Sequence, residues 1–381
     1  MLRQLVICGA ENILTNKKTK MKQIKLALTY DDIQLVPAYS EVKSRQSINL
    51  KTLVSRRFGL LQPLVASPMD TVCGYDMALK MAAMGGVGCI HRFMSIEEQV
   101  KTVKRLQHAI YGEGFGGTIA EDWGVMYDDW HAEIPAVPIM AAIGVQEEDR
   151  LRAIKLVEAG ADILVIDVAH GHHKNMIDMI KWCKEQPEFE RVDIIAGNIA
   201  TADSVIDLEK AGADGLRVGI GGGSLCTTRI KTGFGVPNVT SIMEVAKTAN
   251  VPVMADGGIR TSGDIAKALA VGADTVMIGS LIAGTDEAPG QIVETRSGLY
   301  KRYRGSASLE TKVTHGQAAR NVEGESTTIP YKGGVKYIIT GLLDGVKSAL
   351  SYAGADSLET FQPDIVQVTN AGQNEAKPHL L

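Results

Sequence analysis

The sequence lacks the features that mark membrane, secreted and nucleic-acid-binding proteins. No apolar run approaches the roughly 20 residues that span a bilayer, and residues 1–20 do not have the layout of a signal peptide. The five cysteines are scattered without a CxxC pair, which argues against a disulfide framework or a zinc site. The net charge of −4 offers no basic surface to nucleic acid or a membrane. We therefore expect a cytoplasmic protein.

Aromatic residues are also scarce, whereas glycine is abundant. Six Phe and three Trp stand against 40 Gly, so the core must consist of Val, Ile, Leu, Ala and Met. A repeated pattern occurs at residues 158–171, 210–223 and 270–284: a helix end closed by Gly, an apolar run, and a Gly-rich loop. Gly suits the left-handed residue that ends a helix. A strand that is apolar at every position is typical of a parallel sheet buried on both faces.

Five further segments have the same character and bring the number of expected strands to eight. They are residues 63–67, 86–90, 138–144, 193–198 and 251–258. Helical patterns lie between most of them, for example at 147–159 and 262–271. Eight alternating units predict an α/β fold, a single-domain (β/α)8 TIM barrel. A solenoid of repeats is the alternative, and the unequal spacing of the segments argues against it.

The remaining segments suggest the domain boundaries. They are an N-terminal extension at 1–26, a catalytic barrel at 27–363 and a polar C-terminal tail at 364–381 that docks on a neighbour or stays free. Two long loops interrupt the barrel pattern. One, at 107–137, is rich in Gly, acids and aromatics, and the other, at 304–334 before a helix at 337–353, is polar. Long loops inside a compact fold are usually functional or mobile.

The loop after the expected sixth strand carries the first candidate for chemistry. In such barrels the active site lies at the carboxyl ends of the strands, and GIGGGSLCTTR (219–229) lies there. Its glycines allow the backbone to approach a ligand closely. Cys226 lies among hydroxyl groups and Arg229, where a thiolate would be stabilised, so we predict a nucleophile. The other cysteines, Cys8, Cys73, Cys89 and Cys183, are expected to be buried apolar residues.

The loops after the seventh and eighth strands predict a phosphate site. Barrel enzymes often bind a substrate phosphate between these loops through backbone N–H groups. Both loops are rich in Gly, and the expected donors belong to Gly258, Gly279 and Ser280. Asp256, at the end of the seventh strand, is placed to accept hydrogen bonds from two ribose hydroxyls.

The segment DVAHGHH after the fourth strand has two interpretations. Its histidines, His170, His172 and His173, suggest a metal site. No carboxylate or cysteine cluster lies nearby in the sequence, so we favour a solvated loop. Asp167, at the end of the strand, is expected to face a cofactor.

Several of these segments together resemble the IMP dehydrogenase and GMP reductase superfamily. They are SPMDTV (67–72), GGVGCIHRFMS (85–95), AGNIAT (196–201), GIGGGSLCTTR (219–229) and MADGGIR (254–260). The resemblance covers residues 27–378. It implies a covalent bond between Cys226 and C2 of a purine nucleoside monophosphate while hydride passes between C2 and a nicotinamide. It also implies a homotetramer.

The resemblance implies roles for individual residues. Those expected to bind the substrate are Ser224, Asp256, Gly258, Gly279, Ser280, Tyr303, Glu323 and Gly324. Those expected near the dinucleotide, NADPH or NAD, are Ser67, Asp167, Asn198 and Gly219. The backbone carbonyls of Gly221, Gly223 and Cys226 resemble a site for a monovalent cation, usually potassium. The catalytic residues would be Cys226, Thr228 and Glu287, with the last two as the pair that delivers a proton.

The family performs two reactions, and the loop at 304–334 is expected to distinguish them. Dehydrogenases oxidise IMP to XMP with NAD, and their flap contains an Arg-Tyr pair whose Arg activates water. Here Arg320 is followed by Asn321, and the ending VEGESTTIPYKG resembles the reductase version. The chain also lacks the regulatory CBS insert that dehydrogenases carry between the second and third strands.

Other segments resemble dehydrogenases, among them 29–42, 90–99 and 303–309. The tail at 370–379 resembles a dehydrogenase cation-binding tail, but Ala376 and Lys377 replace a hydroxyl and a His, and Lys377 could replace a bound cation. We expect reduction of GMP to IMP and ammonia with NADPH. IMP oxidation is the alternative, and a non-catalytic nucleotide-binding relative is a minor one.

Overall fold

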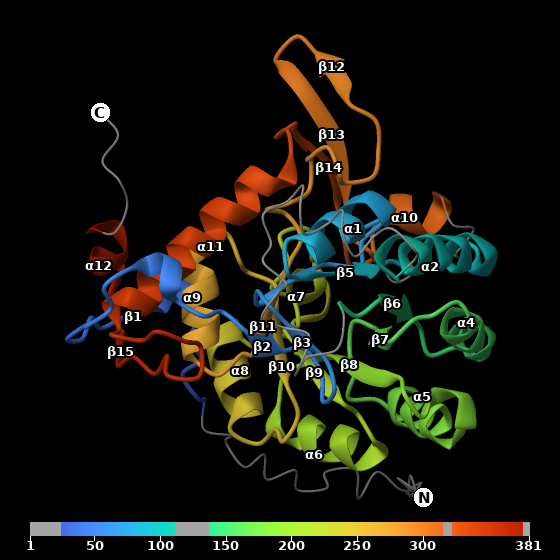
Figure 1. The fold of residues 1–381 in the computed structure, drawn as a ribbon, viewed down its shortest axis with the longest axis horizontal. Helices are drawn as coiled ribbons and strands as arrows, with labels where there is room; N and C mark the ends of the chain where they lie inside the picture. Colours follow the sequence, from blue (N-terminus) through green and yellow to red (C-terminus); the bar gives the residue numbers. More distant parts are fainter. Residues whose placement is uncertain (1–23, 112–136, 315–321, 376–381) are drawn as a thin grey trace, which may run out of the picture.

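Eight parallel strands form a closed barrel, in the order β10-β11-β4-β5-β6-β7-β8-β9 around the ring (Figure 1). The structure is a computed structural model that describes residues 24–111, 137–314 and 322–375. The strand bounds are β4 (Leu64–Ala66), β5 (Val87–Ile90), β6 (Met140–Ile143), β7 (Ile163–Asp167), β8 (Asp193–Ile199), β9 (Gly215–Val218), β10 (Val253–Asp256) and β11 (Thr275–Ile278). Each overlaps one of the eight predicted segments, so the prediction of a TIM barrel is confirmed.

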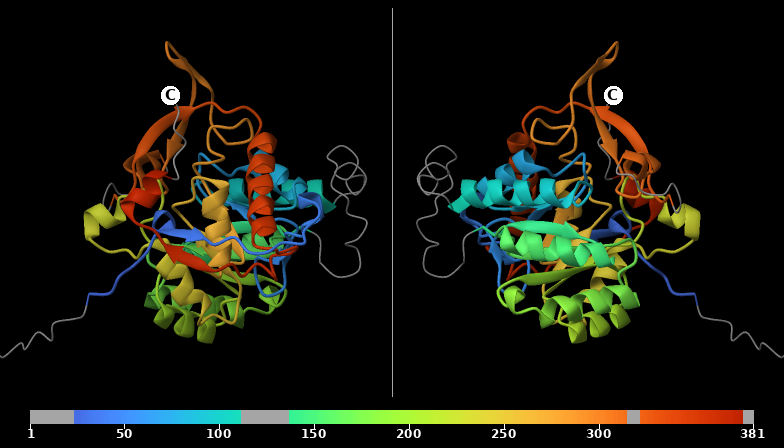
Figure 2. Two further views of the ribbon diagram at one scale, coloured as in Figure 1. Left: turned by 90° about the vertical axis from the view of Figure 1, so that its left-hand side faces the viewer. Right: turned by 90° about the vertical axis from the view of Figure 1, so that its right-hand side faces the viewer.

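Helices surround the barrel on its outer side (Figure 2). Their bounds are α1 (Tyr75–Ala83), α2 (Ile96–Tyr111), α4 (Glu147–Glu158), α5 (Lys174–Glu185), α6 (Ala202–Ala211), α8 (Asn238–Ala246), α9 (Ser262–Ala270) and α11 (Val335–Tyr352). Helix α6 ends at Gly212, whose φ of 108° is in the left-handed region. This is the role that the repeated pattern predicted for its Gly. Among the described helices, none is long and apolar enough to cross a membrane.

The strands are buried on both faces because alternate residues pack in opposite directions. Ile163 and Val165 of β7 belong to an inner cluster with Met140, Met254 and Met277. Leu164 and Ile166, the intervening residues, belong to the larger cluster that includes the helices. The continuous apolar runs in the sequence therefore fill two layers, as a parallel barrel requires.

The region after β11 contains more regular structure than the predicted polar loop at 304–334. β12 (Val293–Thr295), β13 (Gly298–Arg304) and β14 (Ser326–Pro330) form an antiparallel sheet that projects beyond the barrel (Figure 2). The short helix α10 (Leu309–Thr314) lies between β13 and β14. All five side chains of β14 are exposed or half-buried, and its sequence, STTIP, has no apolar alternation that would predict a strand. Residues 315–321 lie outside the described part of the chain.

Two other expectations also differ from the structure. The first residues of the predicted loop at 107–137 continue helix α2 to Tyr111, and residues 112–136 lie outside the described residues. The polar tail does not simply hang free: β15 (Ile365–Gln367) pairs antiparallel with β1 (Ile33–Leu35) of the same chain, and α12 (Asn370–Glu375) follows.

A substitution inside the barrel tests this packing. Ile163 is fully buried in the inner cluster, so Ile163→Ala should lower the free energy of unfolding by about 2–5 kcal/mol through lost burial and a residual cavity. Ile206 on helix α6 is 58% exposed, and Ile206→Ala should change it by about 0.5 kcal/mol or less. Denaturant unfolding of both variants measures the difference. Equal effects would contradict the assignment of the inner layer.

Candidate active site

A cavity of about 480 Å³ opens at the carboxyl ends of the barrel strands. It gathers most of the residues that the sequence singled out, from loops far apart in the chain. Those that line it are Ser67, Asp167, Asn198, Gly219, Gly221, Gly223, Ser224, Cys226, Thr228, Asp256, Tyr303, Glu323 and Gly324. Of the other predicted residues, Gly258, Gly279, Ser280 and Glu287 are not part of its lining.

The loop after β9 brings Cys226 into this cavity. Gly219 adopts a φ of 141°, and a Cβ there would lie 1.9 Å from the carbonyl oxygen of Asp256, so only glycine fits this close approach. The N–H of Cys226 donates a 3.1 Å hydrogen bond to the carbonyl of Gly223. Cys226 is half-buried, whereas Cys73, Cys89 and Cys183 are buried as expected. Cys8 lies outside the described residues.

A chain of hydrogen bonds leads from the thiol of Cys226 to a carboxylate. The Cys226 Sγ donates to Thr228 Oγ1 at 3.1 Å, and Thr228 Oγ1 donates to Glu323 Oε2 at 2.7 Å. The backbone also fixes Glu323, because its carbonyl accepts from the N–H of Thr227 at 2.9 Å. The arrangement can move a proton between the sulfur, the hydroxyl and the carboxylate, which is the work of a general acid–base pair.

Glu287, the predicted partner of Thr228, lies elsewhere. Its Oε2 accepts a 2.9 Å hydrogen bond from the N–H of Val335. A carboxylate in this position satisfies an unpaired donor at the start of helix α11. The expected Thr228–Glu287 pair is therefore replaced by Thr228–Glu323. The sequence placed Glu323 near the base but did not identify its contact with Thr228.

The predicted phosphate residues lie around the hydroxyl of Tyr303. Tyr303 Oη is 3.0 Å from Ser224 Oγ, and a Cβ added to Gly279 would lie 3.6 Å from it. Burial raises the pKa of Tyr303, and hydrogen bonds with Ser224 and Ser280 oppose this shift. The hydroxyl therefore stays protonated at neutral pH and is available as a donor to an anion. Gly258 lies farther along, against the ring of Tyr30.

Sequence reasoning missed Arg217, which lies at the centre of the charged part of the cavity. Its Nη1 lies 2.6 Å from Asp167 Oδ1 and its Nη2 lies 2.9 Å from Asp256 Oδ2. Asn198 Nδ2 also donates to Asp256 Oδ2, at 2.7 Å. Burial lowers the pKa of Arg217, but Asp256 and Asp167 raise it by more. The one signal in the sequence is a charged residue inside the apolar run LRVG (216–219).

The predicted cation site, at the backbone carbonyls of Gly221, Gly223 and Cys226, stays a prediction. The carbonyl of Gly223 already accepts one hydrogen bond, from Cys226, and a carbonyl oxygen has a second lone pair for a cation. Nearby, Arg229 donates from Nε to the carbonyl of Ile220 at 3.3 Å. The tail residues Ala376 and Lys377, discussed above for cation binding, lie outside the described residues.

Two of the three histidines after β7, His172 and His173, have partners within the chain. His172 Nε2 lies 2.8 Å from Asp207 Oδ2, and His173 Nδ1 accepts from the N–H of Asn175 at the start of helix α5. In the described part of the chain, no group of three or more His, Cys, Asp and Glu side chains could hold a metal ion.

A family model described as "IMP dehydrogenase / GMP reductase domain" matches residues 27–379. The protein belongs to this family. A GMP reductase of Leishmania donovani is 35% identical, over 92% of this chain and 96% of its own length. An IMP dehydrogenase of Cryptosporidium parvum is 37% identical, over 94% and 96%. Members are oxidoreductases that act on purine nucleotides with NAD or NADP(H) as cofactor.

A solved structure extends the similarity to the fold of nearly the whole chain. It is a variant GMP reductase from Trypanosoma brucei in complex with guanosine 5'-monophosphate, 32% identical, with a TM-score of 0.84. The match covers 96% of this chain and all of that chain (100%). The same family therefore includes relatives named for either reaction.

The environment of the cysteines predicts their reactivity. Burial raises the pKa of Cys183 to about 12, so this thiol stays protonated and unreactive until the pH approaches that value. Cys226 is half-buried in an open cavity. Iodoacetamide at neutral pH should therefore alkylate Cys226 and leave Cys73, Cys89 and Cys183 unmodified, as peptide mass spectrometry can measure. Preferential labelling of Cys183 in the folded protein would contradict this description.

Proposed function

We propose that the protein is a GMP reductase, which converts GMP to IMP and ammonia with NADPH. The observation that carries the proposal is the hydrogen-bonded chain Cys226–Thr228–Glu323. Removal of the 2-amino group requires a proton, and this chain ends in a group that can store one. The segment that supplies Glu323 has no Arg-Tyr pair to activate water.

The proposed reaction starts with the thiol proton. It passes from Cys226 through the Thr228 hydroxyl to Glu323, and the resulting thiolate adds to purine C2. Glu323 returns the proton through Thr228 to the 2-amino group, which leaves as ammonia, so that sulfur and C2 remain joined. NADPH, when bound, supplies the hydride that C2 accepts. The carbon–sulfur bond then breaks, and IMP leaves while Cys226 regains a proton from solvent.

The rest of the cavity suits a nucleotide and a dinucleotide. In the proposal, Asp256 accepts hydrogen bonds from the ribose, and Ser224, Tyr303, Gly279 and Ser280 surround the phosphate. Ser67, Asp167, Asn198 and Gly219 line the part assigned to the nicotinamide. Arg217 keeps Asp167 and Asp256 in one ion-paired group. A homotetramer, a potassium ion at Gly221, Gly223 and Cys226, and a cytoplasmic location also belong to the proposal.

IMP dehydrogenase is the second candidate, because relatives with that name match this chain as well as the reductases do. A dehydrogenase must hydrolyse the covalent adduct with an activated water. In that reaction the Thr228–Glu323 pair would act as a base that accepts a proton from the water. What opposes this candidate is the sequence of the segment between β13 and β14, which has no Arg-Tyr pair.

Two assays with the purified protein separate the candidates. GMP with NADPH should give loss of NADPH absorbance together with IMP and ammonia, identified by chromatography and an ammonia assay. IMP with NAD should give no sustained formation of XMP. Steady XMP production without GMP reduction would overturn the proposal in favour of the dehydrogenase.

Matched substitutions test the proton-delivering residue. Glu323→Gln removes the carboxylic acid of the chain and should lower kcat for GMP by about 10²-fold to 10⁴-fold. Glu287→Gln makes the same chemical change in a residue that contacts helix α11, and it should leave kcat within about threefold. Steady-state kinetics of both variants give the comparison. A larger loss for Glu287→Gln would restore the original prediction for that residue.

A further inference from the structure

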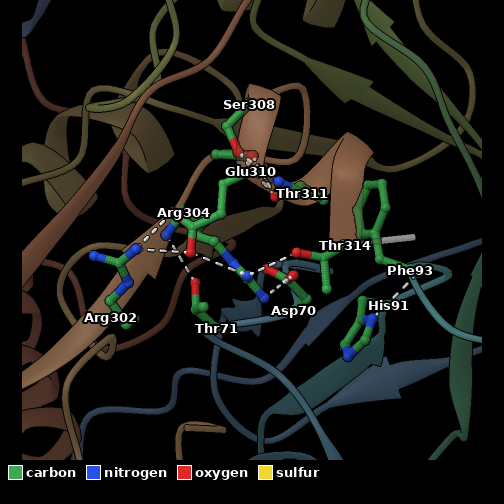
Figure 3. A network of polar contacts seen from close by, with 11 residues as sticks. Asp70, Thr71, His91, Phe93, Arg302, Arg304, Ser308, Glu310, Thr311 and Thr314 are labelled. Carbon is green, nitrogen blue, oxygen red and sulfur yellow. Dashed lines mark hydrogen bonds and ion pairs between the residues drawn. The ribbon is translucent and has the colours of Figure 1, made fainter. Parts of the chain in front are cut away.

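A buried ion pair outside the cavity joins strand β13 to the loop after β4 (Figure 3). Arg304 Nη2 lies 2.5 Å from Asp70 Oδ2, and the two side chains are 17% and 4% exposed. The N–H of Arg304 also donates to Thr71 Oγ1 at 3.0 Å. Side chain and backbone therefore fix the end of β13 against the loop that supplies Ser67 to the cavity wall.

Glu310 extends this contact to helix α10. It accepts 2.9 Å hydrogen bonds from Arg302 Nη2 at both carboxylate oxygens, and a 3.3 Å bond from Arg304 Nη1 (Figure 3). Burial acts to raise the pKa of Glu310, but the hydrogen bond and charge of Arg302, together with the charge of Arg304, hold it below its usual value. Thr311 Oγ1 donates to the carbonyl of Gly305 at 3.1 Å, which closes the turn at 305–308.

The 305–308 turn holds the segment that contains Glu323. The N–H of Glu323 donates to the carbonyl of Ala307 at 3.1 Å, and the N–H of Gly305 donates to the carbonyl of Glu325 at 2.9 Å. A Cβ added to Gly324 would lie 2.9 Å from the N–H nitrogen of Ser308, so the two segments are in close contact. The opposite side of the Glu323 segment contacts the Cys226 loop through Thr227.

We propose that Asp70 and Arg304 are positioning residues for the Glu323 carboxylate. Their ion pair sets the place of the 305–308 turn, and the turn sets where Glu323 meets the hydroxyl of Thr228. Neither residue is among those that line the cavity, so their effect passes through the backbone. The inference rests on the proposed function for the direction of the reaction, although the contacts themselves do not depend on it.

Removal of either side chain should displace the turn, because the direct contact between β13 and the loop after β4 is then lost. Arg304→Gln and Asp70→Asn should each lower kcat by at least tenfold, toward the roughly 10²-fold that a misplacement of about 1 Å costs. The KM for the nucleotide should change by less than about threefold, since its expected contacts remain. Arg302→Gln is the matched control: it makes the same change on the same strand, but the Arg302 side chain is 54% exposed and pairs with Glu310, not with Asp70.

A double substitution separates positioning from general stabilisation. If Arg304 acts through Glu323, Arg304→Gln should lower kcat no further in a Glu323→Gln background. If the losses of kcat from the two single substitutions multiply in the double variant, the proposal is overturned. Equal kcat values for Arg304→Gln and Arg302→Gln would also overturn it. Circular dichroism and thermal unfolding would show whether Arg304→Gln folds normally. If it folds poorly, Arg304→Lys is the variant to measure, because it keeps a positive charge beside Asp70 and should recover part of kcat.

A failure of the proposed function would be visible separately. If the wild-type protein oxidises IMP and does not reduce GMP, the proposed direction is wrong, and the same variants measured on IMP oxidation still test the positioning. The alkylation rate of Cys226 adds a readout that needs no turnover. Arg304→Gln should change the alkylation rate in the same direction as Glu323→Gln, and Arg302→Gln should leave the rate unchanged. A changed rate in Arg302→Gln together with an unchanged rate in Arg304→Gln would overturn the proposed positioning role.

Discussion

The hydrogen bond between Thr228 and Glu323 joins two segments that are 95 residues apart in the chain. One segment follows barrel strand β9, and the other precedes β14 of the small antiparallel sheet. The loops of the barrel therefore supply the proposed nucleophile, Cys226, but not the proposed acid, Glu323. The site is complete only where the segment that precedes β14 contacts the Cys226 loop, so the contacts that hold this segment also decide the proposed chemistry.

Charge is distributed in this site according to what each part must bind. Arg217 pairs with both Asp167 and Asp256 in the interior, and Arg92 Nε lies 4.0 Å from Asp167 Oδ2, so both carboxylates have cationic partners in a cavity where isolated charges would be costly. The expected phosphate region instead offers hydroxyl groups and glycine backbone around Tyr303. In the proposed function, the substrate phosphate is thus bound by neutral donors.

The sequence predicted the barrel because each of its strands is apolar at nearly every position and each is followed by a loop at the same end. Cys226 and Asp256 could be identified because they lie in the loop after such a strand or at its end, whereas the role of Thr228 was implied by the resemblance to the family. The Thr228–Glu323 contact could not, since it depends on how β14 pairs with β13, and the mostly polar, exposed residues of β14 show no apolar period. Arg217 was missed for the opposite reason: a buried charge inside an apolar run becomes explicable only when both of its carboxylate partners are placed.

The central claim is that Glu323 serves the removal of the amino group and not the hydride step. The most direct measurement uses the Glu323→Gln variant in both directions. With IMP and NADP⁺ it should still give a burst of NADPH, because that half-reaction joins Cys226 to C2 without ammonia; the burst should be slower than in the wild type only because Glu323 also accepts the thiol proton. With GMP and NADPH it should release ammonia far more slowly than the wild type. Equal loss of the burst and of ammonia release, or undiminished release of ammonia, would contradict the account.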